Sequence, residues 1–161
     1  MPVRDVHLQP CSVFSVSRRL QTHAPGAWPL VAVFVLVGCT SSPDKPATMA
    51  GLPECGWLPN CVNTQSGRGT QHSEPIRADA EQWQKLKLWI AGQEDWEITI
   101  DENNFMQAVV KTPVMKFRDD VQLLFSPDDM LIQVRSSSRL GISDLGANAR
   151  RVETLRDQLS R

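Results

Sequence analysis

The sequence has almost no excess of either charge: 17 lysines and arginines face 18 aspartates and glutamates in 161 residues, a net charge of −1. Proteins that bind nucleic acid usually carry a broad basic surface, so this balance argues against nucleic acid as a partner. The chain also lacks an apolar run of the roughly 20 residues that a membrane-spanning helix requires. Its 41% of hydrophobic residues is ordinary for a globular protein, and its length fits one domain.

Motifs for several common chemistries are also missing. The sequence has no Gly-x-Ser-x-Gly nucleophile turn, no phosphate-binding glycine loop and no dinucleotide-binding fingerprint. Histidine is scarce, and His72 is the one histidine after residue 39. Serines such as Ser136 therefore have a single distant imidazole as a candidate base, so we predict no catalytic residue and no cofactor.

The longest apolar run spans Trp28 to Cys39, with ten apolar residues of twelve, and it follows a segment that is richer in arginine than in acidic residues. This charge gradient is typical of an export signal. The run ends in the tetrapeptide Leu36-Val37-Gly38-Cys39. These four residues resemble a bacterial lipobox, in which the cysteine thiol is acylated and the cysteine becomes the new amino terminus.

The lipobox resemblance implies three segments: a signal peptide over residues 1–38, a lipidated cysteine with a flexible tether over residues 39–51, and one domain over residues 52–161. Thr40, rather than an acidic residue, follows the cysteine, which in Gram-negative lipoproteins implies sorting to the outer membrane. We therefore expect a lipoprotein of the cell envelope that faces the periplasm and has the membrane as a partner through its palmitate-type anchor. An uncleaved anchor helix that ends at Cys39 is the alternative.

Cys55 and Cys61 are the cysteines that remain after the expected lipid attachment site. Glycine and proline between them favour a turn, and the envelope is oxidising, so we predict a disulfide between them. A redox-active pair is the weaker alternative, because the spacing is not Cys-x-x-Cys. Zinc is weaker still, because His72 and these two thiols fall short of four ligands, and we predict no metal.

Periodicity predicts two helices and four strands. Trp83, Leu86 and Ile90 recur at helical spacing after the expected cap Asp79, and residues 152–159 repeat the helical pattern. Alternation of apolar and polar residues predicts strands over residues 96–101, 121–125 and 130–135, the last two as a hairpin. A turn at residues 102–104 leads into a fourth strand over residues 105–111. Short connections favour antiparallel pairing, so we expect an α+β domain with a small antiparallel four-stranded sheet flanked by two helices.

A polar cluster near the end of this hairpin and the start of the last helix is the candidate site. Its members are Asp119, Asp120, Arg135, Arg139, Asp144, Asn148 and Arg151. Asp119 and Asp120 are adjacent in a strand, so their side chains point to opposite faces and cannot share a proton. One hypothesis is a structural network of arginine–carboxylate pairs that also satisfies a buried Asn148. The other is a cleft in which Arg135, Arg139 and Arg151 bind an anionic small molecule or a lipid head group.

Three segments carry a family resemblance: Pro59-Asn60-Cys61-Val62, Phe117-Arg118-Asp119-Asp120-Val121, and the Arg-Ser-x-Ser-Arg-x-Gly-x-x-Asp-x-Gly-x-Asn block that ends at Asn148. They resemble the domain-of-unknown-function family numbered 1499, found in bacterial lipoproteins, and the similarity covers roughly residues 52–159. The resemblance implies a fold but no activity. We expect a binding or scaffolding domain; a small hydrolase or ligand-transfer domain that uses the Arg/Asp cluster is the alternative.

Overall fold

The computed structural model describes residues 51–112 and 116–160. The predicted signal peptide, the predicted lipid site Cys39 and the predicted tether up to residue 50 lie outside the described residues. Within the described ranges, neither helix combines the length and the apolar character that crossing a membrane requires. The described residues thus cover most of the predicted domain.

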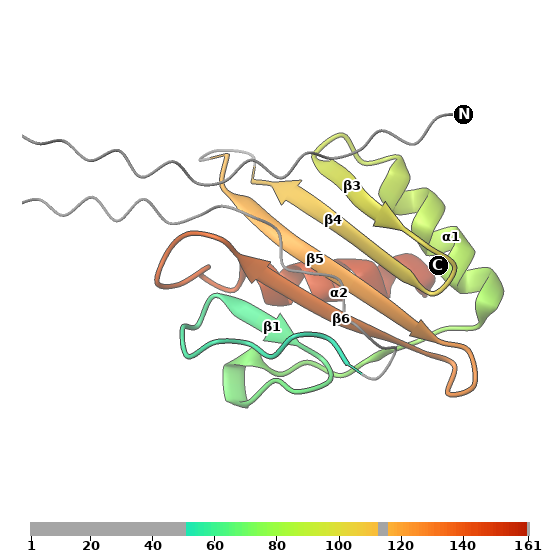
Figure 1. Ribbon diagram of the computed structural model, residues 1–161, viewed down its shortest axis with the longest axis horizontal. Helices are drawn as coiled ribbons and strands as arrows, with labels where there is room; N and C mark the ends of the chain where they lie inside the picture. Colours follow the sequence, from blue (N-terminus) through green and yellow to red (C-terminus); the bar gives the residue numbers. More distant parts are fainter. Residues whose placement is uncertain (1–50, 113–115, 161) are drawn as a thin grey trace, which may run out of the picture. The chain divides into compact units, whose positions relative to one another are not determined.

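Six antiparallel strands form one sheet with the order β1-β6-β5-β4-β3, and β2 also pairs with β6 (Figure 1). The strands are β1 (Cys61–Asn63), β2 (Ile76–Arg77), β3 (Trp96–Asp101), β4 (Phe105–Lys111), β5 (Arg118–Ser126) and β6 (Leu131–Ser138). The prediction of an α+β domain is confirmed, but the prediction of a four-stranded sheet is wrong. β1 and β2 have three and two residues, which is too few for an alternating pattern to show in the sequence.

The first helix, α1 (Ala80–Ala91), begins at the predicted cap. The Asp79 carboxylate accepts a hydrogen bond from the backbone N–H of Gln82, and the Gln82 side chain accepts one from the backbone N–H of Asp79. This reciprocal pair satisfies two of the N–H groups that a helix start leaves without partners. The side chains that α1 buries are Trp83, Leu86 and Ile90, as the helical spacing predicts.

The second helix, α2 (Ala147–Leu159), covers the same face of the sheet as α1, and both lie behind the sheet in Figure 1. Val152 and Leu155 of α2 join the buried residues of α1 in one apolar core. From β5, the residues that enter this core are Val121, Leu123 and Phe125. The ring centroids of Trp83 and Phe125 are 5.7 Å apart in a stacked arrangement, which ties α1 directly to the centre of the sheet.

The register of β5 and β6 brings polar residues together at one end of the sheet. Asp119 lies opposite Ser138, and Asp120 lies opposite Ser137. β1 continues the arrangement across the other edge of β6, where Cys61 lies opposite Ser137. β6 therefore ends at the place in the sheet where β5 and β1 begin, and α2 begins at the same end of the sheet (Figure 1).

The segment before β1 is closed by the predicted disulfide, since Cys55 and Cys61 are bonded with an S–S distance of 2.07 Å. Hydrogen bonds then fix this loop to its surroundings. The Gln71 amide donates to the carbonyl oxygens of Gly56 and Leu58, and the Asn60 amide donates to the carbonyl of Gly141. The disulfide loop therefore lies against the segment that leads from β6 to α2.

Replacing both Cys55 and Cys61 with alanine is expected to lower the free energy of unfolding by about 2 kcal/mol, because the bond closes a short loop whose cross-link restricts the unfolded chain only modestly. Urea denaturation followed by tryptophan fluorescence measures the change. Non-reducing mass spectrometry of the protein purified without reductant checks the bond itself, and free thiols at both positions would contradict it.

Candidate functional site

Asp119 and Asp120 are both buried, with exposed fractions of 1% and 4%, and they point to opposite faces of the sheet. On the helix face, Arg151 Nη2 donates to Asp119 Oδ2 at 2.7 Å. On the other face, the Arg139 guanidinium donates twice to Asp120, from Nε at 2.9 Å and from Nη2 at 2.8 Å. Each carboxylate therefore has its own arginine, and the two ion pairs are separated by the sheet.

Arg135 lies on the same sheet face as Asp120, since it alternates along β6 with Val134 and Ser136, which face the helices. Burial lowers the pKa of Arg135, and the charge of Asp120 offsets part of that effect. In Arg139, by contrast, the hydrogen bonds to Asp120 raise the pKa. The three arginines that the anion-binding hypothesis placed in one cleft are therefore divided, with Arg151 on the face opposite Arg135.

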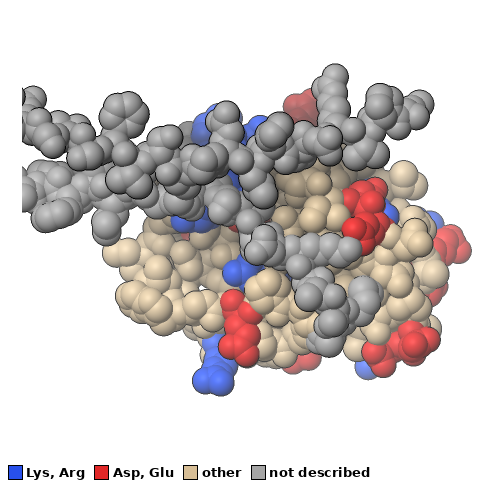
Figure 2. Space-filling model, viewed as in Figure 1, with Lys and Arg blue, Asp and Glu red and all other residues tan. Residues whose placement is uncertain are grey.

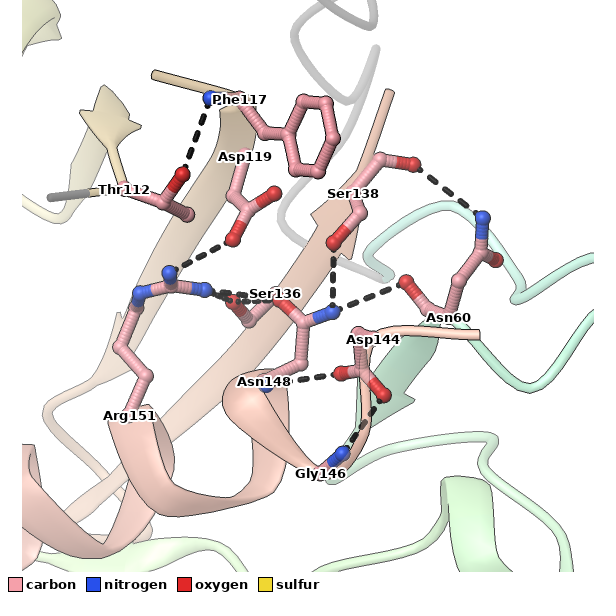
Figure 3. Close-up of polar contacts among 10 residues, drawn as sticks. All are labelled: Asn60, Thr112, Phe117, Asp119, Ser136, Ser138, Asp144, Gly146, Asn148 and Arg151. Atoms are coloured by element: carbon pink, nitrogen blue, oxygen red, sulfur yellow. Dashed lines mark hydrogen bonds and ion pairs between the residues drawn. The ribbon is translucent and has the colours of Figure 1, made fainter. Parts of the chain in front are cut away.

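Asn148 is the centre of the network on the helix face, and it is fully buried (Figure 3). Its amide nitrogen donates to the Asn60 carbonyl at 2.9 Å and to Ser138 Oγ at 3.2 Å. Its amide oxygen accepts from Ser136 Oγ at 2.6 Å and from Arg151 Nη1 at 2.7 Å. Both donors and the acceptor oxygen of the side chain are thus used, and they join the start of α2 to β6 and to the disulfide loop.

Asp144 stabilises the start of α2 rather than pairing with an arginine. Its Oδ1 accepts from the backbone N–H of Gly146 at 3.0 Å, and its Oδ2 accepts from that of Asn148 at 2.8 Å. Gly146 has a φ of +80°, a left-handed conformation that glycine adopts without steric cost. Asp144 therefore provides the hydrogen-bond acceptors that the helix start needs, as a cap does.

A pocket of about 440 Å³ opens beside this network. We call it the Asp119 pocket, and the lining residues that matter below are Phe117, Asp119, Ser138, Leu140, Leu145 and Arg150. Most of its wall is apolar, and Figure 3 shows Phe117 and Ser138 on the side of Asp119 that faces away from Arg151. Of the predicted polar cluster, Asp119 and Asp144 line this pocket, whereas its apolar wall was not predicted.

One oxygen of Asp119 has no hydrogen-bond partner within the described part of the chain. Oδ2 accepts from Arg151, whereas Oδ1 is buried and receives no donor from any described residue. A buried carboxylate normally accepts several hydrogen bonds, and a buried acceptor without a partner lowers stability by roughly 1–3 kcal/mol. Asp119 lines the pocket, and Figure 3 shows its second oxygen on the side of Phe117 and Ser138, so Oδ1 is a candidate acceptor for a donor group of a bound molecule.

Exposed apolar side chains form part of the wall of the same pocket. Among the described residues, the large apolar side chains that are exposed are Trp57, Leu88, Phe117, Met130, Leu140, Ile142 and Leu145. Three of them line the Asp119 pocket, and Leu145 is 85% exposed. On the visible described surface in Figure 2, acidic and basic side chains are both present among uncharged residues.

Ser136 and His72 do not form a catalytic pair. The Ser136 hydroxyl donates to the Asn148 amide oxygen and accepts from Arg151. His72 Nε2 lies 3.3 Å from Glu74 Oε1. Over residues 51–112 and 116–160, no three His, Cys, Asp or Glu side chains come together in a group that could hold a metal ion.

A family model described as "Protein of unknown function (DUF1499)" matches residues 51–159, nearly all of the described domain. No curated protein and no solved structure matches the chain. The match includes all seven residues of the candidate polar cluster.

Proposed function

Since the chain belongs to the DUF1499 family, whose description names no activity, we propose its function from the site: a lipid-anchored binding domain of the cell envelope that holds an amphiphilic molecule in the Asp119 pocket. The observation that carries this proposal is the combination of a mostly apolar pocket with one buried acceptor, Asp119 Oδ1, that no described donor satisfies. Small-molecule sites typically combine an apolar lining with a few directed polar groups.

The rest of the polar cluster supports binding rather than catalysis. Asp120 is engaged by Arg139, Asp144 by backbone N–H groups, and Asn148 by four hydrogen-bond partners. Such groups hold the wall of a pocket in place but are not available as a nucleophile or a base. The hydrolase alternative would require a hydroxyl activated by a base, whereas the Ser136 hydroxyl donates a hydrogen bond to the amide oxygen of Asn148.

The envelope location rests on the sequence. Leu36-Val37-Gly38-Cys39 supplies the lipobox, and Thr40 favours the outer membrane, so the domain would face the periplasm at the end of a short tether. A disulfide between Cys55 and Cys61 suits that oxidising compartment. An apolar pocket held close to a bilayer would have amphiphiles, including lipid head groups with their chains, as its most abundant potential ligands.

Filling the pocket tests the binding function. Ala147 lines the pocket at the first position of α2, so Ala147→Phe places an aromatic ring in the space that a ligand would occupy. We expect wild-type protein, purified from membranes in mild detergent, to carry a co-purifying amphiphile in native mass spectrometry. We expect Ala147→Phe to lose that adduct.

The matched control is Ala91→Phe, which makes the same exchange at the exposed end of α1, outside the residues that line the pocket. It should retain the adduct at the wild-type level. If Ala147→Phe is folded and still retains the full adduct, the Asp119 pocket is not the binding site and the proposed function is wrong.

A further inference from the structure

The ion pair that Asp119 forms with Arg151 limits the charge of the group that can donate a hydrogen bond to Asp119 Oδ1. The carboxylate is 2% exposed at its side chain and already forms an ion pair with Arg151, whose side chain is 11% exposed. The pair is neutral as a unit, so a second cation at Oδ1 would have only Asp144 of the pocket lining as a counter-charge, and both Asp144 oxygens already accept from backbone N–H groups. The desolvation of such a charge costs several kcal/mol. An uncharged donor satisfies Oδ1 without that cost.

An anionic group is disfavoured at the same place. Asp119 and Asp144 both line the pocket, and Asp144 directs its two oxygens to the backbone N–H groups of Gly146 and Asn148. The basic residue in the lining, Arg150, is exposed and donates from Nη1 to the Leu145 carbonyl. A carboxylate or phosphate placed against Asp119 would therefore meet like charge at short range and find its counter-charge only at the mouth.

The neighbouring hydroxyl adds a donor to this end of the pocket. Ser138 Oγ accepts from the Asn148 amide at 3.2 Å, and its own hydrogen has no acceptor among the described residues. Asp119 Oδ1 and Ser138 Oγ lie on paired positions of β5 and β6 and line one pocket. An acceptor and a donor side by side match a hydroxyl group, which donates one hydrogen bond and accepts others.

We propose that the ligand of the Asp119 pocket is an uncharged hydroxyl-bearing amphiphile, whose hydroxyl donates to Asp119 Oδ1 and whose chain packs against Phe117, Leu140 and Leu145. The inference rests on the proposed function and narrows it to one class of ligand. The required chemistry is an alcohol head on an apolar chain. A membrane lipid with a hydroxylated head supplies both parts, whereas a soluble polyol shares the hydroxyl group but lacks the chain.

Four probes with a ten-carbon chain, counting the carboxylate carbon of decanoate, test the head group: decanol, 1-methoxydecane, decylammonium and decanoate. Isothermal titration calorimetry on the purified full chain gives the four affinities. Decanol should bind about tenfold or more tightly than its methyl ether, which has the same chain but cannot donate to the carboxylate. Decylammonium and decanoate should both bind more weakly than decanol. Glycerol, which has hydroxyls but no chain, tests the contribution of the chain: much weaker binding than decanol supports an amphiphile, and equal binding overturns the amphiphile assignment in favour of a soluble polyol.

Asp119→Asn gives a second, independent readout. The asparagine oxygen can still accept from Arg151, which leaves the amide N–H₂ facing the pocket as a donor in place of an acceptor. We expect the preference for decanol over the methyl ether to fall from tenfold to about equal or to reverse. A loss of stability alone would weaken both probes together and leave their ratio unchanged.

The outcomes separate the inference from the proposed function. Equal wild-type affinities for decanol and 1-methoxydecane, or tightest binding of decylammonium or decanoate, overturn the hydroxyl assignment. If these probes are nevertheless lost in Ala147→Phe, the pocket remains a binding site for amphiphiles of another class. If Ala147→Phe binds decanol as the wild type does, the site assignment itself fails. The head-group series on the wild-type chain requires no variant, so the test holds even if Asp119→Asn does not fold.

Discussion

Replacing Arg151 with alanine is expected to lower the free energy of unfolding by about 3–5 kcal/mol, because it leaves the buried carboxylate of Asp119 without its counter-charge. Asp119 has an exposed fraction of 1%, and Arg151 is its hydrogen-bond partner at 2.7 Å. The same change removes the Arg151 donor from Ser136 and Asn148, both fully buried. Urea denaturation followed by tryptophan fluorescence, at constant pH, measures the difference.

The control for this prediction is an ion pair without burial. Lys85 and Glu81 form an i,i+4 pair on α1, with side chains 68% and 77% exposed, so Lys85→Ala should leave the unfolding midpoint almost unchanged. The double variant Asp119→Ala with Arg151→Ala should be more stable than Arg151→Ala alone, because it no longer buries an unpaired charge. A loss below about 1 kcal/mol in Arg151→Ala would contradict this account of the pair.

The longer helices and strands were predictable because the spacing of their apolar residues and the helix cap are visible in the sequence itself. The helix predicted after the cap Asp79 spans Ala80–Ala91 in the structure, and it buries the face that the spacing of Trp83, Leu86 and Ile90 indicates. The four predicted strands correspond to β3, β4, β5 and β6. β1 and β2 owe their extended conformation to pairing with β6, which no window of three or two residues can reveal.

The candidate site was predictable in its members but not in its pairing. Strand alternation requires Asp119 and Asp120 to face opposite sides, and they do. Which arginine meets which carboxylate depends on the register of β6 against β5 and on the path of α2 across the sheet, and both are tertiary properties. Asp144, predicted within an arginine–carboxylate network, instead accepts from backbone N–H groups, because it immediately precedes a helix start.

The apolar wall of the pocket was not predictable for a similar reason. Phe117 precedes β5, whereas Leu140 and Leu145 lie in the connection from β6 to α2, so no periodic pattern unites them. Single exposed apolar residues are normal on a protein surface and carry no signal on their own. They become a site only because β5 and β6 are paired and α2 returns to the same end of the sheet, next to Asp119 Oδ1.

Cys39→Ser is expected to abolish both palmitate labelling and membrane association of the protein. The proposed lipid attachment uses the Cys39 thiol, and a serine hydroxyl at that position does not replace it. Two or three acyl chains bind a bilayer stably, because each buried methylene contributes roughly 0.8 kcal/mol, so removing the modification removes the anchor rather than weakening it. Metabolic labelling with palmitate, followed by separation of membrane and soluble fractions, measures both effects.

A second cysteine in the leader supplies the matched control for the anchor. Cys11 lies within the 38 residues that processing at Cys39 would remove, so Cys11→Ser should label and fractionate as the wild type does. A Cys39→Ser protein that still labels and still fractionates with membranes would contradict the lipid anchor and favour an uncleaved apolar segment.

The two parts of the proposed function are separable by this comparison, because the described domain contains neither cysteine and the Asp119 pocket needs neither for its geometry. Cys39→Ser protein that is released from the membrane should therefore still distinguish decanol from its methyl ether, which would place ligand recognition in the domain and delivery of the domain to the bilayer in the anchor.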